Sequence, residues 1–192
     1  MQVYRDAAAR IESETVSRPA RSWAVILDAD ETILDNSLYA KERGSLPHEE
    51  AAWAAWVRRR EATAVPGARE FLDGVRSRGG IVAVVTNRRA DQCDDTRANL
   101  QALGLAFDVV LCRPADGPGD KSPRFERVAR GEALTGAGPL EVLAWIGDNI
   151  LDFPGGSQAL RDAPDAALAD FGTRFFVLPN PVYGSWERSP DR

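Results

Sequence analysis

The sequence lacks the features on which membrane and low-complexity proteins depend. No stretch approaches the roughly 18 or more consecutive apolar residues that a membrane-spanning helix requires. The first residues carry neither the basic segment nor the apolar stretch of a secretory signal, so as written we expect a cytoplasmic protein without a membrane span. No internal repeat or low-complexity segment interrupts the 192 residues. One domain with a modest insertion fits this length.

Histidine and cysteine are also scarce. The only histidine, His48, stands beside Pro47 and before two glutamates, a context typical of a loop or the start of a helix. A reaction through a phosphohistidine would depend on this residue alone, and its neighbours do not suit that role. The two cysteines, Cys93 and Cys112, belong to apolar patterns. We therefore expect buried free thiols.

Basic residues are outnumbered by acidic ones. The chain has 24 Lys and Arg against 29 Asp and Glu, and a formal net charge of -5. A general nucleic-acid binder needs a basic face that displaces phosphate counterions, so we expect no nucleic-acid polymer as a partner. A small phosphorylated substrate needs only local positive charge. The candidate oligomeric state is a homodimer.

An apolar stretch that ends in acid organises the chain. Residues 23–27 are mostly bulky or β-branched and do not alternate with polar residues, which predicts a short buried strand. Asp28 ends this strand, and Asp30 follows two positions later. At the C-terminal end of a parallel strand, both would face the crevice where open α/β sheets bind ligands. Two acids this close repel each other unless a cation or a proton is present, which indicates a metal and acid-base chemistry. For this pair alone, a solvated acidic turn is an equal alternative, and the rest of the chain favours the metal.

Later segments place further polar groups after apolar runs. Residues 80–85 predict a second buried strand before a helix, and residues 142–146 predict another strand. The hydroxyl, the amide and the helix start after the second strand are groups that bind phosphate. The polar residues of interest are Thr86 and Asn87, then Lys121, then Asp148 and Asp152. Lys41 is the only other lysine, so the chain keeps a compact ammonium at Lys121 although arginine is abundant.

Helical patterns alternate with these strands. The alternation predicts an α/β fold, a Rossmann-like doubly wound parallel sheet with right-handed crossovers. Residues 36–79 contain two helical patterns and no strand pattern, so we expect a small helical cap inserted between the first and second motifs. The core then comprises residues 1–35 and 80–192. The other predicted elements are strands at 107–111 and 174–178, helices at 4–14, 90–105 and 165–171, a helix after Lys121, and an extended loop at 179–187.

The order of these motifs resembles the haloacid dehalogenase superfamily of phosphohydrolases, and more closely its subfamily IIIB, the class C bacterial acid phosphatases. The motifs that carry the resemblance are Asp28-x-Asp30-x-Thr32, Leu34-Asp35-Asn36-Ser37-x-Tyr39, Val85-Thr86-Asn87-Arg88, Lys121, Gly147-Asp148-Asn149-x-x-Asp152-Phe153 and Leu178-Pro179-Asn180-Pro181-x-Tyr183-Gly184-Ser185-Trp186-Glu187. They cover nearly the whole chain. Members of this family are typically exported, so the localisation stays open. Ala29 departs from the larger aliphatic residue that the family often carries there.

The resemblance implies magnesium-dependent hydrolysis of small phosphomonoesters, with 5′-nucleotides as candidate substrates. Asp28 would attack phosphorus and become an aspartyl-phosphate. Asp30 would protonate the leaving group and then activate the water that cleaves the intermediate. Magnesium fits because a small, hard cation prefers oxygen ligands.

The resemblance also assigns the binding groups. The carboxylates of Asp28 and Asp148 and the backbone carbonyl of Asp30 would hold the metal, and Asp152 would orient them. The phosphoryl group would be bound by Lys121, Thr86 and Asn87.

Aromatic residues of the expected cap have two interpretations. Trp53 and Trp56 share one stripe of a helix predicted at 49–60 and would fill the seam between cap and core. Alternatively, Trp56, with Tyr39 or Tyr183, offers a ring face to a substrate base or aromatic leaving group. A stack of that kind contributes about 1 kcal/mol.

Two other functions use similar residues. A phosphoacceptor signalling domain also carries acids, a threonine and a lysine on a parallel sheet, but it places its acceptor on a later strand and lacks the second acid two residues beyond. A catalytically silent binding protein on the same scaffold would not need Asp28 and Asp30 intact. Both alternatives stay open at this point.

Overall fold

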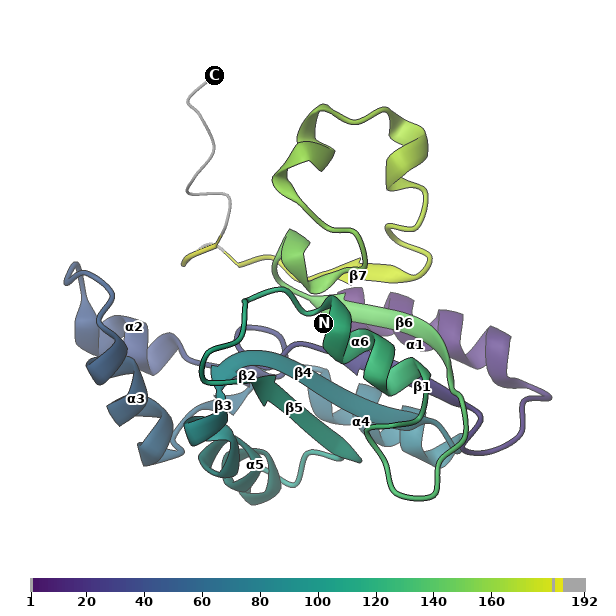
Figure 1. Ribbon diagram of the computed structural model, residues 1–192, viewed down its shortest axis with the longest axis horizontal. Helices are drawn as coiled ribbons and strands as arrows, with labels where there is room; N and C mark the ends of the chain where they lie inside the picture. Colours follow the sequence, from purple (N-terminus) through teal and green to yellow (C-terminus); the bar gives the residue numbers. More distant parts are fainter. Residues whose placement is uncertain (1, 181, 185–192) are drawn as a thin grey trace.

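The computed structural model describes residues 2–180 and 182–184 and has an α/β fold around a five-stranded sheet (Figure 1). The strand order is β5-β4-β1-β6-β7, and every neighbouring pair is parallel. The strands are β1 (Trp23–Leu27), β4 (Ile81–Arg89), β5 (Val109–Arg113), β6 (Glu141–Gly147) and β7 (Phe175–Val177). All five predicted strands are therefore confirmed, with ends that shift by a few residues. The central position of β1 places Asp28 at the middle of the sheet's C-terminal edge.

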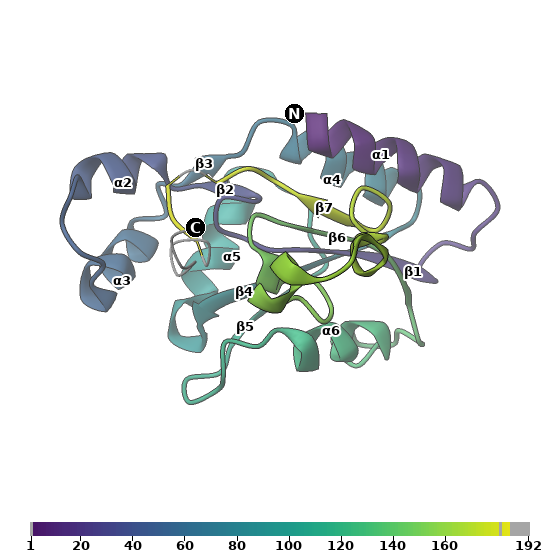
Figure 2. The ribbon, with the colours of Figure 1, turned by 90° about the horizontal axis from the view of Figure 1, so that it is seen from above.

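Helices cover both faces of the sheet, which explains why β1 shows no alternation of polar and apolar residues. Figure 2 shows α1 and α4 on one side of the sheet and α6 on the other. Val25 and Leu27 belong to the core on the α1 side, whereas Ala24 and Ile26 belong to the core on the α6 side. The helices are α1 (Gln2–Thr15), α2 (Ser37–Arg43), α3 (Glu50–Arg59), α4 (Ala68–Ser77), α5 (Cys93–Ala102) and α6 (Ser122–Ala129).

The segment predicted as a cap contains more structure than expected. Helices α2 and α3 lie to one side of the sheet (Figure 1). The expectation that residues 36–79 hold no strand is wrong, because β3 (Thr63–Ala64) pairs antiparallel with β2 (Leu34–Asp35). Strands of two residues are too short to show a period in the sequence. Helix α4 packs against α1 and β4.

Two of the predicted helices differ from the observed elements. The helix predicted at 90–105 starts with a 3₁₀ turn, Ala90–Gln92, and α5 then ends at Ala102. The helix predicted at 165–171 is only a 3₁₀ turn, Asp165–Leu168, whose residues are all exposed, so little burial is available to extend it. The remaining 3₁₀ turns are Ile150–Asp152 and Gln158–Asp162. The extended loop predicted at 179–187 lies partly outside the described residues. None of the helices in the described part of the chain is both long and apolar enough to cross a membrane.

The two cysteines form a disulfide, so the expectation of free thiols is wrong. Cys93 begins α5 and Cys112 lies in β5, with their Cα atoms 5.9 Å apart. The chain passes from β4 into α5 through the 3₁₀ turn Ala90–Gln92, and β5 pairs with β4. The start of the helix therefore lies beside the next strand, a proximity that the spacing of 19 residues does not reveal.

Candidate active site

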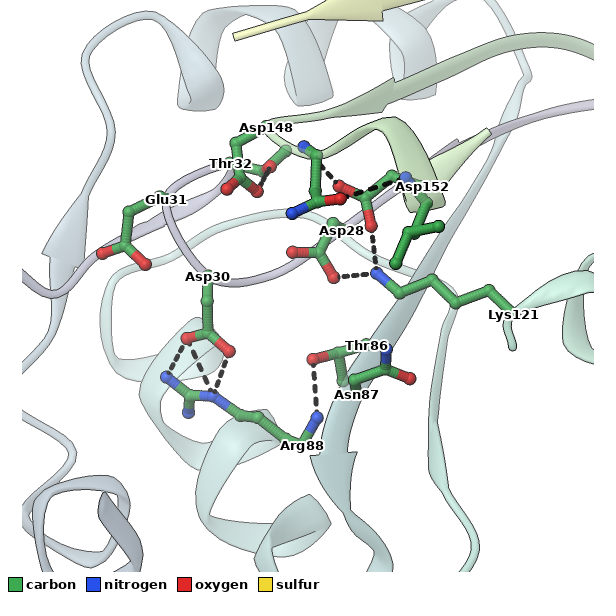
Figure 3. Close-up of polar contacts among 12 residues, drawn as sticks. Asp28, Asp30, Glu31, Thr32, Thr86, Asn87, Arg88, Lys121, Asp148 and Asp152 are labelled. Carbon is green, nitrogen blue, oxygen red and sulfur yellow. Dashed lines mark hydrogen bonds and ion pairs between the residues drawn. The ribbon is translucent and has the colours of Figure 1, made fainter. Parts of the chain in front are cut away.

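The polar residues predicted to act together converge at the C-terminal edge of the sheet. Asp28 follows β1, Asp148 follows β6, and Thr86 lies near the end of β4. Lys121 immediately precedes α6, on the face of the sheet opposite α1. Figure 3 shows the side chains of Asp28 and Asp152 at the lysine ammonium and the side chain of Asp148 beside Thr32.

Three carboxylates form a compact acidic cluster. One oxygen from each of Asp28, Asp148 and Asp152 lies within 4.8 Å of the others. Burial raises the pKa of Asp28 well above its ordinary value despite the nearby lysine. Burial, followed by the charge of Asp152, raises the pKa of Asp148 to about 6. Negative charge is therefore in excess here, and the all-oxygen donor set suits a hard divalent cation.

Lys121 lies inside this cluster. Its side chain is 3% exposed, and its ammonium donates to Asp28 and, at 2.7 Å, to Oδ1 of Asp152. Burial lowers its pKa, but the charges of the two carboxylates outweigh burial and raise the pKa overall. Lys121 is thus a buried cation in direct contact with the carboxylate of Asp28.

Thr86 and Asn87 lie beside Lys121 but make different contacts. Thr86 is buried, and its Oγ1 accepts a hydrogen bond of 3.1 Å from the backbone amide of Arg88. Asn87 is exposed, and its side chain donates to the carbonyl of Gly119 at 2.9 Å. Arg124 donates to the Thr86 carbonyl and, at 2.7 Å, to Oδ1 of Asn87. Arg124 therefore ties α6, and with it the loop before Lys121, to the end of β4.

Asp30 points away from the acidic cluster and toward Arg88 (Figure 3). The two side chains form an ion pair at 2.6 Å between Nη2 and Oδ1. Asn36 donates to the same oxygen at 2.9 Å and accepts a hydrogen bond of 2.8 Å from Nε1 of Trp56. Asp30 is thus held by a network that reaches helix α3.

The loop after β1 is fixed by residues near both ends of the described chain. The buried hydroxyl of Tyr4 donates to the carbonyl of Thr32 at 2.6 Å. The hydroxyl of Thr32 donates to Oδ1 of Asp148 at 3.2 Å, and Asn180 donates to Oδ2 at 2.8 Å. Both oxygens of Asp148 therefore have a donor in the described part of the chain.

Tyr183 makes a second contact with this loop. Its hydroxyl donates to Glu31, a residue that adopts a left-handed backbone conformation with φ of 54°. Burial, followed by the charge of Asp30, raises the pKa of Glu31 to about 7. Tyr183 is 40% exposed, so part of its surface stays open to a ligand.

The aromatic residues of α2 and α3 pack on one another. Trp56 is 2% exposed, and Arg59 covers its ring with the guanidinium carbon 4.8 Å from the ring centroid. The half-buried Tyr39 ring lies 5.1 Å from the Trp53 ring and 5.8 Å from the Trp56 ring, measured between centroids. Trp56 thus belongs to the hydrophobic core cluster that contains Tyr4 and Phe71, and little of its ring is accessible.

Several residues that hold the site had no predicted role. Asn36, Arg88 and Asn180 belong to the motifs that carry the family resemblance. That resemblance is the sequence signal that could have identified them. Tyr4 carried no comparable signal, because a tyrosine in an amphipathic helix usually indicates core packing.

Comparisons with known proteins agree with this arrangement. The family described as HAD superfamily, subfamily IIIB (Acid phosphatase), matches residues 1–186. The class C acid phosphatase from Bacillus anthracis is similar, with 28% identity and a TM-score of 0.83 over 97% of this chain and 78% of that chain. Its structure with tungstate bound has the same identity and coverage and a TM-score of 0.82. A chain of the Pnkp1/Rnl/Hen1 RNA repair complex shares the fold at 16% identity and a TM-score of 0.52, over 85% of this chain and 43% of that chain. The chain thus belongs to subfamily IIIB of the HAD superfamily, the acid phosphatases, and is a phosphatase.

Proposed function

We propose that this phosphatase hydrolyses small phosphomonoesters through an aspartyl-phosphate on Asp28. The observation that carries the proposal is the position of this carboxylate, buried at a strand end beside Lys121 and within the cluster of three acids. Spontaneous hydrolysis of phosphate monoesters is so slow that enzymes supply up to about 10²¹-fold acceleration. Covalent catalysis and charge neutralisation therefore need to act together.

In the first step, an oxygen of Asp28 bonds to phosphorus while the bond from phosphorus to the ester oxygen breaks. Asp30 gives its proton to the departing oxygen. In the second step, water attacks the phosphorus of the aspartyl-phosphate and passes a proton to Asp30. Phosphate leaves, and both carboxyl groups return to their starting states. Acid-base catalysis of this kind contributes typically about 10²–10⁴-fold.

The residues that would hold a divalent cation are the carboxylates of Asp28 and Asp148 and the backbone carbonyl of Asp30. Asp152 would orient this shell. The arrangement of the acids supports this assignment, because one oxygen from each of Asp28, Asp148 and Asp152 lies within 4.8 Å of the others. When bound, the cation supplies positive charge to the phosphoryl oxygens. We propose Mg²⁺, since every donor is oxygen.

Lys121, Thr86 and Asn87 form the proposed binding site for the phosphoryl oxygens. The compact ammonium of Lys121 is already positioned against the carboxylate of Asp28. The similar Bacillus anthracis enzyme has been solved with tungstate, a tetrahedral oxyanion like phosphate. That likeness supports an oxyanion site in this chain.

The proposed substrates are small esters, with 5′-nucleotides as candidates. The cap segment at 36–79 carries α2 and α3 beside the site and would exclude large phosphoproteins. Tyr183 is the aromatic residue best exposed to meet a base, whereas Tyr39 and Trp56 pack mainly on each other. A contribution of Tyr39 and Trp56 to substrate binding would be indirect, through the shape of the cap.

A panel of phosphate esters, assayed with and without a chelator, tests this function. We expect sustained turnover that the chelator abolishes and Mg²⁺ restores, rather than the single-equivalent labelling of a phosphoacceptor domain. Asp28→Asn should abolish turnover, and Asp30→Asn should slow it by at least about a hundredfold. A normal rate in Asp28→Asn would remove the aspartyl-phosphate from the mechanism.

A further inference from the structure

We propose that Arg88 is a positioning residue: its guanidinium fixes the carboxylate of Asp30 and couples it to the cap helix α3. The inference rests on the function proposed above, in which Asp30 transfers the proton. Arg88 lies in β4, in the segment that the sequence associates with phosphate binding. The contacts of its side chain point to a different task.

The ion pair between Arg88 and Asp30 is buried and multiply bonded. The side chains are 1% and 15% exposed, respectively. Nη2 donates to Oδ1 at 2.6 Å, and Nε lies 3.0 Å from Oδ1 and 3.1 Å from Oδ2. A planar guanidinium that uses two nitrogens fixes the orientation of a carboxylate as well as its distance.

The two oxygens of Asp30 are held unequally. Oδ1 accepts from Nη2 and Nε of Arg88 and from Nδ2 of Asn36 at 2.9 Å. Oδ2 accepts, among the described residues, only the longer bond from Nε. Because a carboxylate has about four lone-pair positions, Oδ2 keeps the greater capacity to form a further hydrogen bond. Arg88 thereby selects which oxygen takes part in the transfer.

Two contacts join this carboxylate to α3. The guanidinium carbon of Arg88 lies 5.5 Å from the centroid of the Trp53 ring, within the range of a cation–π interaction. Asn36, which also donates to Asp30, accepts a hydrogen bond from Trp56 at 2.8 Å. A shift of α3 would therefore reach Asp30 through both the arginine and the asparagine.

The same contacts argue against direct phosphate binding by Arg88. All three guanidinium nitrogens already donate to the protein, Nη1 to Thr96 at 3.2 Å and the other two to Asp30. A phosphate would have to break bonds of a buried ion pair to reach this cation. Arg88 acts through Asp30 and not on the substrate.

The test compares two esters in an Arg88→Lys variant. 4-Nitrophenyl phosphate has a weakly basic leaving group that needs little protonation, whereas glycerol phosphate releases a strongly basic alkoxide. If Arg88 positions the general acid, kcat/KM should fall at least about tenfold more for glycerol phosphate than for the nitrophenyl ester. Equal losses for both esters, or no loss, would overturn the proposal.

The experiment also includes a control variant and a double variant that removes both charges of the ion pair. Arg60→Lys alters an exposed ion pair with Asp95 at the end of α3, and it should leave the ratio between the esters unchanged. If Arg88→Lys does not fold, the double variant Asp30→Asn with Arg88→Met removes both buried charges. It should match Asp30→Asn alone in kcat/KM, and a further loss of about tenfold or more would contradict action through Asp30.

Asp28→Asn, measured in parallel, separates the two proposals. If that variant keeps turnover, the proposed function fails. If it is inactive while the Arg88 variants treat both esters alike, only the positioning role of Arg88 fails.

Discussion

The side-chain amide of Asn180 donates a hydrogen bond of 2.8 Å to Oδ2 of Asp148, across 32 residues of sequence. The opposite oxygen of Asp148 accepts from the hydroxyl of Thr32 at 3.2 Å. Two donors on opposite oxygens fix the plane of this carboxylate. Outer partners of this kind orient metal ligands and set their affinity.

Asn180→Ala should therefore weaken the binding of the divalent cation by about 10- to 100-fold. The measurement is a titration of phosphatase activity with Mg²⁺, in which the half-saturating concentration rises. Tyr183→Phe is the matched control in the same segment, because it removes the hydrogen bond to Glu31 and spares Asn180. Unchanged cation dependence in Asn180→Ala would show that Asp148 is not a ligand or that its orientation does not matter.

The stability of the protein without divalent cations should decrease as the pH rises from about 4 to 7. The pKa of Asp148 is raised from 3.8 to about 6 and that of Glu31 from 4.5 to about 7. In this range these two side chains keep their protons in the folded protein but have released them in the unfolded chain. Their contribution to stability is complete below pH 4 and is lost as the pH rises through their folded-state pKa values. The shift of Asp148 alone corresponds to about 3 kcal/mol of unfolding free energy.

Urea unfolding between pH 4 and 8 measures this decrease. With chelator the midpoint should fall across the range, and with excess Mg²⁺ the fall should become smaller because the cation binds the ionised acids. Glu31→Gln, which does not titrate, should show a shallower fall in chelator. A midpoint that rises between pH 4 and 7 in chelator would contradict the raised pKa values.

Lys121→Met should lower both stability and activity. The substitution leaves the carboxylates of Asp28 and Asp152 buried without their shared cation. Removing one partner of a buried ion pair costs about 3 to 5 kcal/mol of unfolding free energy. Denaturant unfolding at pH 7 in chelator measures the loss, and turnover measures the catalytic effect.

The other lysine supplies the control for this substitution. Lys41 is exposed on α2, so Lys41→Met should change neither quantity. Full activity in Lys121→Met would show that the ammonium is structural only.

Cys93→Ser with Cys112→Ser should destabilise the protein by about 2 to 4 kcal/mol, because the disulfide no longer restricts the unfolded chain. The bond closes a loop with a sequence separation of 19, between α5 and β5. Unfolding with and without a reductant provides the measurement. The reductant should lower the midpoint of the native protein and leave that of the double variant unchanged, and an identical midpoint for both proteins would contradict a stabilising disulfide.

The sheet and the residues at its C-terminal edge could be predicted from the sequence for a physical reason. Buried parallel strands are apolar runs, and the polar residue that ends a run such as 23–27 must lie at the edge where the strand stops. Asp28 and Asp148 could be found in this way, and they do lie together. Lys121 precedes α6 and ends no strand; the scarcity of lysine and the family resemblance pointed to it, and it contacts Asp28.

The residues that orient these groups could not be found in the same way. Arg88 had no predicted role in the sequence, and only the path of the loop after β1 brings the carboxylate of Asp30 to it. The disulfide depends on the start of α5 lying beside β5. Both are contacts between segments that are distant in sequence, so local sequence patterns do not reveal them.

The loop that carries the proposed nucleophile is secured from both directions along the chain. Tyr4 anchors it from the first helix, and Asn180 and Tyr183 hold the groups around it from beyond the last strand. A growing polypeptide emerging from the ribosome would thus possess Asp28 early but would lack its final supports until the segment around position 180 had been released. Hydrolysis of a phosphate ester by nascent chains should accordingly begin only after that segment has been released, even if the sheet assembles sooner.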